Sequence, residues 1–101
     1  MKKITLSKVE SLKLASLLEN AGYTPTEKQM YIRFSTNKRG DSVFLHHSLD
    51  VIRCRDNTKA KDIIVLMFGA PNGKTPESQD NGTMLSWFFN GYVGKSTTRL
   101  N

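Results

Sequence analysis

Two adjacent histidines, His46 and His47, have side chains whose ordinary pKa, about 6.5, suits proton transfer near neutral pH. Ser48 and Asp50 follow them and complete a cluster of residue types that hydrolytic sites use. Neighbouring side chains of a strand point to opposite faces, however, so the two imidazoles would not reach one substrate or one metal ion. We therefore predict a protein without catalytic residues, without a bound metal and without a cofactor.

The segment that ends at Gly22, followed by predicted strands and the histidine pair, resembles the small ribonuclease toxins of toxin–antitoxin systems. In those toxins a catalytic histidine follows a Gly-Ser pair only a few residues beyond the helix. In this sequence His46 lies far beyond Gly22, and no Gly-Ser pair precedes it. A small ribonuclease is therefore the least favoured of the three functions that we consider.

A glycine-rich segment at 69–75, with the sequence GAPNGKT, follows the apolar run at 63–68. It resembles the phosphate-binding loop of P-loop nucleotide-binding proteins, in which a strand precedes the loop, backbone N–H groups surround the phosphates and a helix follows. Three residues separate the two glycines instead of four, and Pro76 and a polar run stand where the helix would begin. We therefore expect an ordinary turn and no nucleotide binding.

Cationic side chains are the broadest functional signal, because fifteen Lys and Arg against nine Asp and Glu give a net charge of +6. Such a positive field favours polyanions or acidic proteins as partners. Alternation along 30–35 and 50–55 directs three arginines to one side of a sheet, away from the core. That side would suit nucleic acid, with phosphates held by cations and a base stacked on a tyrosine. The predicted nucleic-acid-binding residues are Tyr31, Arg33, Lys38, Arg39, Arg53 and Arg55.

A protein-binding inhibitor or adaptor is the alternative function, and it would use another part of the chain. Trp87 and Tyr92 belong to an aromatic segment, and Lys74 lies in the long loop before it. These three residues would contact an acidic or nucleic-acid-binding host protein, and a small inhibitor from a bacterial virus is an example of this function. The charge does not distinguish nucleic acid from an acidic protein, and the sequence leaves DNA, RNA, oligomeric state and source open.

Length and composition predict one small globular domain of the cytoplasm, spanning 1–101, with a flexible tail at 94–101. Apolar residues make up 38 % of the chain and charged residues 24 %, which is typical of globular proteins. Cys54 is the only cysteine, so no internal disulfide forms, and we expect it in the core. No apolar run has the length of a signal peptide or of a membrane span, so we expect no membrane partner.

The elements that position these residues are predicted to form a two-layer α+β domain, with an amino-terminal helix packed on an antiparallel sheet of four to five strands. A helix over 8–21 is indicated by a capping box at Ser7 and Glu10, by leucines at helical spacing and by Gly22 after its end. Its predicted core residues are Leu14, Leu17 and Leu18.

Strands are predicted at 30–35, 42–47, 50–55 and 62–69, and 84–93 is expected to be a final strand or a short aromatic segment that closes the core. The nearly all-apolar run at 62–69 is typical of a central strand that is covered on both sides. Residues 70–83 are polar and are expected to form a long loop. Whether 24–35 is helix or strand stays open, because its start favours a helix and its end alternates, and we expect a short helical turn at most before the strand.

Overall fold

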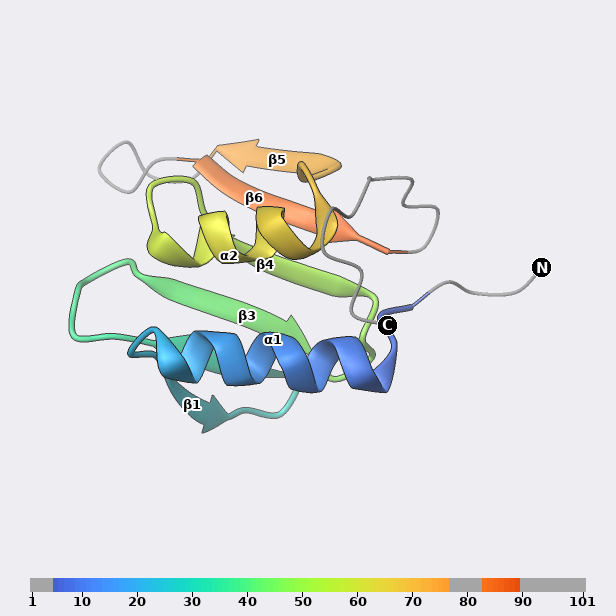
Figure 1. Ribbon diagram of the computed structural model, residues 1–101. Coiled ribbons are helices and arrows are strands. Elements are labelled where there is room, and N and C mark those ends of the chain that lie inside the picture. Colours follow the sequence, from blue (N-terminus) through green and yellow to red (C-terminus); the bar gives the residue numbers. More distant parts are fainter. Residues whose placement is uncertain (1–4, 77–82, 90–101) are drawn as a thin grey trace.

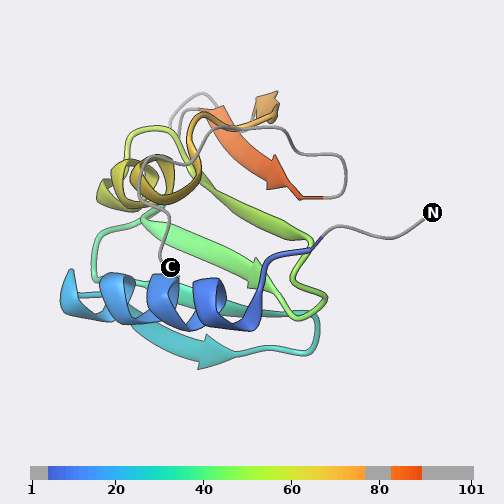
Figure 2. The ribbon, with the colours of Figure 1, turned by 45° about the vertical axis from the view of Figure 1, so that its right-hand side comes forward.

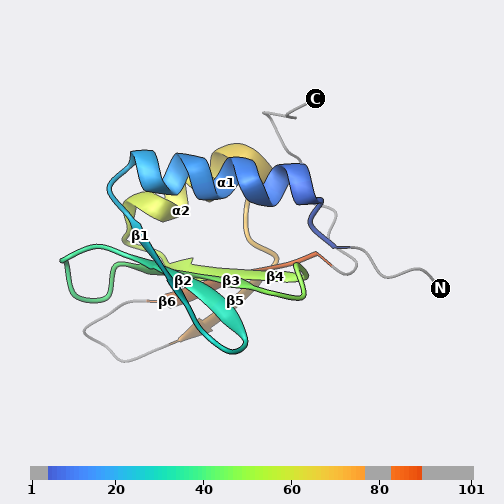
Figure 3. The ribbon, with the colours of Figure 1, turned by 90° about the horizontal axis from the view of Figure 1, so that it is seen from below.

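Six strands form one antiparallel sheet in the computed structural model, which describes residues 5–76 and 83–89, and two helices lie against one face of it (Figures 1 and 3). The strands are ordered β1-β2-β3-β4-β6-β5 across the sheet. The predicted α+β class is confirmed, with more strands than the four to five expected and with a second helix. The elements are α1 (Lys8–Asn20), β1 (Thr24–Glu27), β2 (Tyr31–Ser35), β3 (Ser42–His46), β4 (Val51–Arg55), α2 (Lys59–Phe68), β5 (Gly73–Pro76) and β6 (Thr83–Phe88).

Helix α1 begins and ends as the sequence predicts. The Ser7 hydroxyl accepts a hydrogen bond from the backbone N–H of Glu10 at 3.0 Å, and the Glu10 carboxylate accepts one from the N–H of Ser7 at 3.1 Å. Gly22 follows the helix with a φ of +102°, which a residue with a Cβ rarely adopts. The capping box and this glycine therefore define both ends of α1.

Helix α2 replaces the strand that was predicted over 62–69, and that prediction is wrong. The Thr58 side chain caps the helix by accepting from the backbone N–H of Lys61 at 3.2 Å. Leu66 is 56 % exposed, which a strand covered on both sides would not allow. A short apolar run fits a buried strand and a helix equally, and here the polar start at 58–62 makes the helix. The buried residues of α2 are Ala60, Ile64, Met67 and Phe68.

Strand β1 lies where a short helical turn was the most that we expected, and this expectation is also wrong. It pairs antiparallel with β2, so that Pro25 lies opposite Phe34. A proline is tolerated in this position because β1 is at the edge of the sheet, where one row of backbone groups has no neighbouring strand.

Strand β5 lies inside the stretch 70–83 that was expected to be a loop. It pairs with β6, and Asn72 joins the two strands at one end. The Asn72 side chain donates to the carbonyl oxygen of Phe88 at 2.8 Å and accepts from its N–H at 2.7 Å. The short strand is thus held by a side chain as well as by its backbone ladder.

The remaining strands follow the sequence-based expectation. Strands β2, β3 and β4 lie within the predicted ranges 30–35, 42–47 and 50–55, and β6 covers the first part of 84–93. The rest of that last range and the expected tail at 94–101 lie outside the described residues. None of the helices in the described part of the chain is long and apolar enough to cross a membrane.

The two helices lie on one side of the sheet (Figure 2), and the buried core residues come from both of these layers. Trp87 is completely buried, and its indole N–H donates to the carbonyl oxygen of Gly69 at 2.9 Å. Cys54 is buried as predicted, and burial raises the pKa of its thiol to about 12. Two of the three predicted leucines of α1, Leu14 and Leu18, are completely buried, whereas Leu17 is partly buried.

Candidate nucleic-acid interface

The face of the sheet opposite the two helices is here called the open face (Figure 3). Side chains alternate along each strand and paired residues share a face, so the register assigns its members. Three of the predicted arginines are among them, and no member within the described strands carries a carboxylate. The open face consists of Thr24, Thr26, Tyr31, Arg33, Ser35, Ser42, Phe44, His46, Val51, Arg53, Arg55, Gly73, Thr75, Met84, Ser86 and Phe88.

A row in which arginine and phenylalanine side chains alternate crosses the middle of the open face. Arg33 lies opposite Phe44, and Phe44 lies opposite Arg53 on the next strand. The Arg53 guanidinium carbon is 5.3 Å from the centre of the Phe44 ring, within the range of a cation–π contact. The Arg33 Nε donates to the Ser42 hydroxyl at 3.3 Å, which orients the exposed guanidinium. Two arginines thus lie on either side of one aromatic ring.

Aromatic side chains extend this row along the sheet. The ring centres of Tyr31 and Phe44 are 5.2 Å apart, with the rings nearly perpendicular at 88°. The ring centres of Tyr31 and His46 are 5.8 Å apart. Phe88, on β6, keeps 43 % of its surface exposed although it is a large apolar side chain. Exposed rings of this kind can stack on nucleic-acid bases.

Phe44 and Phe88 are members of the open face that the sequence analysis missed. The sequence pattern around Phe44 does indicate its side of the sheet, because Phe44 lies between two apolar residues, Val43 and Leu45. Both of these neighbours are buried in the structure. Alternation along β3 therefore turns Phe44 to the other side of the sheet. For Phe88 no such signal existed, since its neighbours Trp87 and Phe89 are aromatic too.

A small cavity of about 160 Å³ lies on the open face near the end of β4. Arg33 and Arg55 line it from two strands, and Ser42 and Phe44 line it from the strand between them. Gly40, from the hairpin that joins β2 to β3, completes the lining. The predicted cations Lys38 and Arg39 lie in the same hairpin and are exposed.

The β2–β3 hairpin is fixed to the rest of the molecule through Asp41. Its carboxylate accepts hydrogen bonds from the Tyr23 hydroxyl at 2.5 Å and from the Thr36 hydroxyl at 3.0 Å. The Tyr23 oxygen in turn accepts from the backbone N–H of Ala60 at 3.1 Å, at the start of α2. Burial and the neighbouring Asp41 carboxylate raise the pKa of Tyr23, so its proton stays in this bridge.

The two histidines of the sequence lie in different surroundings. His46 is on the open face, where burial and the charge of Arg53 lower the pKa of its imidazole. His47 follows β3, and its Nε2 is 2.9 Å from the Glu27 carboxylate and 2.9 Å from the carbonyl oxygen of Lys28. Among the residues that the structure describes, no three His, Cys, Asp or Glu side chains are placed to hold a metal ion.

The glycine-rich segment 69–75 is a turn that leads from a helix into a strand. Gly69 ends α2, and Gly73 begins β5. A phosphate-binding loop has the reverse order, strand before and helix after, so the strand assumed before this segment is wrong. The N–H groups of a helix N-terminus are therefore not available at this turn.

The three residues proposed for protein binding lie in different places. Trp87 is in the core and presents no surface to a partner. Lys74 is exposed on β5, at the edge of the sheet. Tyr92 lies outside the described residues. The aromatic segment at 84–89 thus serves mainly to close the core, with Phe88 as its exposed member.

Comparison of the chain with protein-family models, with curated proteins and with solved structures found no match.

Proposed function

We propose that this protein is a small, non-enzymatic protein of the cytoplasm that binds single-stranded nucleic acid on the open face of its sheet. The observation that carries the proposal is the row Arg33, Phe44, Arg53, on a face whose described strands contribute no carboxylate. Guanidinium groups form bidentate hydrogen bonds with phosphates, and the Phe44 ring between the two arginines offers a surface on which a base can stack. A single buried cysteine fits a reducing compartment.

The rings of the open face, which are at least partly exposed, favour a single strand over a duplex. In a duplex the bases are stacked on one another and cannot reach Tyr31, Phe44 or Phe88. In a single strand the bases can turn toward these rings while the phosphates lie along the arginines. Contacts of this kind depend little on sequence, since every base has a flat aromatic face.

Protein binding is the second candidate function, and an observation on α1 favours it. Val9 and Leu12 are 64 % and 65 % exposed. Leu12 also lines a mainly apolar groove of about 240 Å³ between α1 and the sheet, together with Ile32 and Leu49. An inhibitor or adaptor would use this surface rather than Trp87.

Fluorescence anisotropy with short single-stranded DNA, single-stranded RNA and the corresponding duplex tests the proposed function. We expect binding of the single strands at low salt, and loss of this binding in the double variant Arg33→Glu, Arg53→Glu. Each phosphate contact that is removed should reduce the slope of log affinity against log salt by about 0.7.

The matched control is Lys8→Glu, Lys13→Glu, which changes the net charge equally but at exposed positions of α1, on the other side of the sheet. Circular dichroism establishes that both variants are folded. Equal loss in the two variants would show that net charge alone attracts the probe, and no binding of wild type at tens of micromolar protein would refute the proposal.

A further inference from the structure

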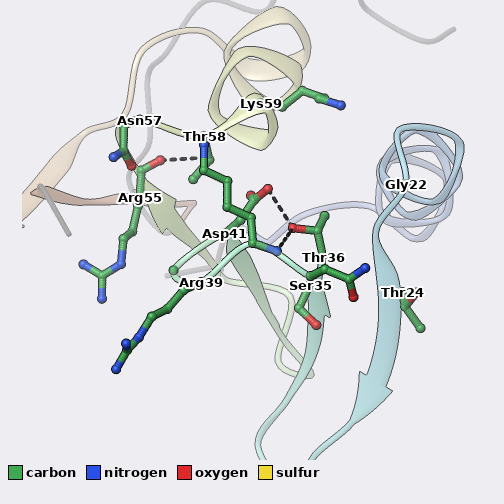
Figure 4. A pocket seen from close by; sticks show the side chains of 13 residues that line it. Gly22, Thr24, Ser35, Thr36, Arg39, Asp41, Arg55, Asn57, Thr58 and Lys59 are labelled. Carbon is green, nitrogen blue, oxygen red and sulfur yellow. Dashed lines mark hydrogen bonds between the residues drawn. The ribbon is translucent and has the colours of Figure 1, made fainter. Parts of the chain in front are cut away.

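A pocket of about 810 Å³, here called the rim pocket, lies at the end of the sheet where the β2–β3 hairpin meets the start of α2 (Figure 4). Three segments form its walls: the turn from α1 into β1, the hairpin 35–41, and residues 55–59 between β4 and α2. Its volume is within the roughly 300–1,000 Å³ of pockets that hold small ligands. The rim pocket therefore has room for a group of several polar atoms.

Positive charge dominates the lining of the rim pocket. Lys38 and Arg39 come from the hairpin, Arg55 from the end of β4 and Lys59 from the first turn of α2. In Figure 4 the side chains of Arg39 and Arg55 extend to the same side of the hairpin. Asp41 is the one carboxylate among the lining residues, and its two oxygens already accept from two hydroxyl groups. The Lys59 ammonium donates to the carbonyl oxygen of Ala21 at 3.5 Å. The lining thus contains four cations and one carboxylate, and both oxygens of that carboxylate accept hydrogen bonds within the protein.

The lining also indicates what kind of group would bind. Apart from the charged residues it consists of glycines, hydroxyl side chains and asparagines, with neither an aromatic nor an aliphatic side chain. Such a lining offers no stacking surface to a base. Cations and hydroxyl groups are the donors that phosphate oxygens accept from in protein–nucleic-acid contacts. The rim pocket therefore matches a phosphate group rather than a nucleobase.

The rim pocket continues directly into the open face. Gly40 and Arg55 line both the rim pocket and the small cavity between Arg33 and Phe44. A strand whose bases stack on the open face would therefore bring its phosphates past Arg55 to the hairpin.

We propose that the rim pocket is a phosphate-binding site that holds a phosphate of the strand leaving the open face, which rests on the proposed function of that face. The phosphate is either the terminal phosphomonoester or an internal phosphodiester of the strand. Both present oxygens to Lys38 and Arg39, and the terminal group carries the greater charge, about −1.5 to −2 near neutral pH.

The first test measures the affinity of one oligonucleotide with a 5′-phosphate, with a 3′-phosphate and with hydroxyl groups at both ends. The variant is Lys38→Ala, Arg39→Ala, and the matched control is Lys8→Ala, Lys13→Ala on α1. We expect the Kd of the hairpin variant to be about tenfold higher than that of the control variant, because two charge-assisted contacts are lost. A loss confined to one phosphorylated end identifies the terminal group, and an equal loss with all three identifies an internal phosphate. No loss beyond the control overturns the proposal.

The second test does not depend on nucleic acid and so separates this proposal from the proposed function. Inorganic pyrophosphate is titrated to millimolar concentration while the backbone amide signals of 36–41 are followed by NMR. We expect saturable shifts of these signals in wild type and in the Arg33→Glu, Arg53→Glu variant, and none in Lys38→Ala, Arg39→Ala. Absence of shifts in wild type overturns the phosphate site. Shifts without any oligonucleotide binding would instead refute the function of the open face.

Discussion

Strand β4 contributes to two surfaces with opposite chemistry. Ile52 and Cys54 point toward the helices and are completely buried, whereas Val51, Arg53 and Arg55 point to the open face and are partly exposed. Apart from the edge strands, the covered face is mainly apolar and holds the helices, and the open face is cationic and aromatic. One sheet thus separates the residues that maintain the fold from those available for binding, and substitutions on the two faces should have different effects.

The largest difference is expected between two phenylalanines on neighbouring strands. Phe34 is 1 % exposed on the covered face, and Phe44 is partly exposed on the open face. Phe34→Ala should lower the free energy of unfolding by about 3–5 kcal/mol, since it leaves a cavity in the core. Phe44→Ala removes ring contacts with Tyr31 and Arg53 and should lower it by only about 1 kcal/mol.

Urea denaturation of both variants measures this difference. Equal losses of stability would mean that the open face is part of the core, and the separation of the two surfaces would then fail. In the binding assay the order is reversed, because only Phe44→Ala removes a surface on which a base would stack.

An intermediate effect is expected where the two faces meet, at the bridge from Tyr23 to Asp41 and Ala60. Tyr23→Phe removes one donor to the Asp41 carboxylate and leaves the Ala60 N–H without its acceptor. The loss of these buried hydrogen bonds should lower the free energy of unfolding by about 1–3 kcal/mol. Hydrogen exchange should accelerate at the Ala60 amide more than at amides in the middle of α1. Unchanged exchange at Ala60 would show that the bridge does not hold the hairpin.

The smallest effect concerns the pH dependence of stability through His46 on the open face. Its pKa is lowered in the folded protein by burial and by Arg53, with Asp50 opposing, so below about pH 6.5 the unfolded state binds more protons than the folded state. Stability should therefore decrease slightly as the pH falls from neutral through this range. His46→Gln should flatten the profile of the free energy of unfolding against pH. A profile of this variant parallel to that of wild type would contradict the assignment.

The sequence predicts those parts of the fold in which local signals agree. Helix α1 has a cap at each end and an apolar stripe, and strands β2, β3 and β4 alternate clearly, so their boundaries and the shared face of Arg33, Arg53 and Arg55 follow from the spacing alone. The alternation within each strand is enough to assign a side, because the period of a strand is two.

The parts that were not predicted depend on contacts between distant segments. The run at 63–68 is apolar enough for a strand or a helix, and only packing on the sheet decides. The residues at the start of β1 favour a helix, but pairing with the backbone of β2 makes this segment a strand. The rim pocket lies between the hairpin 35–41 and residues 55–59, and no local sequence pattern predicts that these two segments are close together.

The two outermost strands affect whether copies of this protein can pair edge to edge in concentrated solution. β1 and β5 form the edges of the sheet, each is four residues long, and each contains a proline, Pro25 or Pro76. A proline has no backbone N–H, so neither edge can offer a complete row of donors to a strand of another molecule. Sheet-to-sheet polymerisation is hindered at both borders, although the open face carries the partly exposed rings of Tyr31, Phe44 and Phe88.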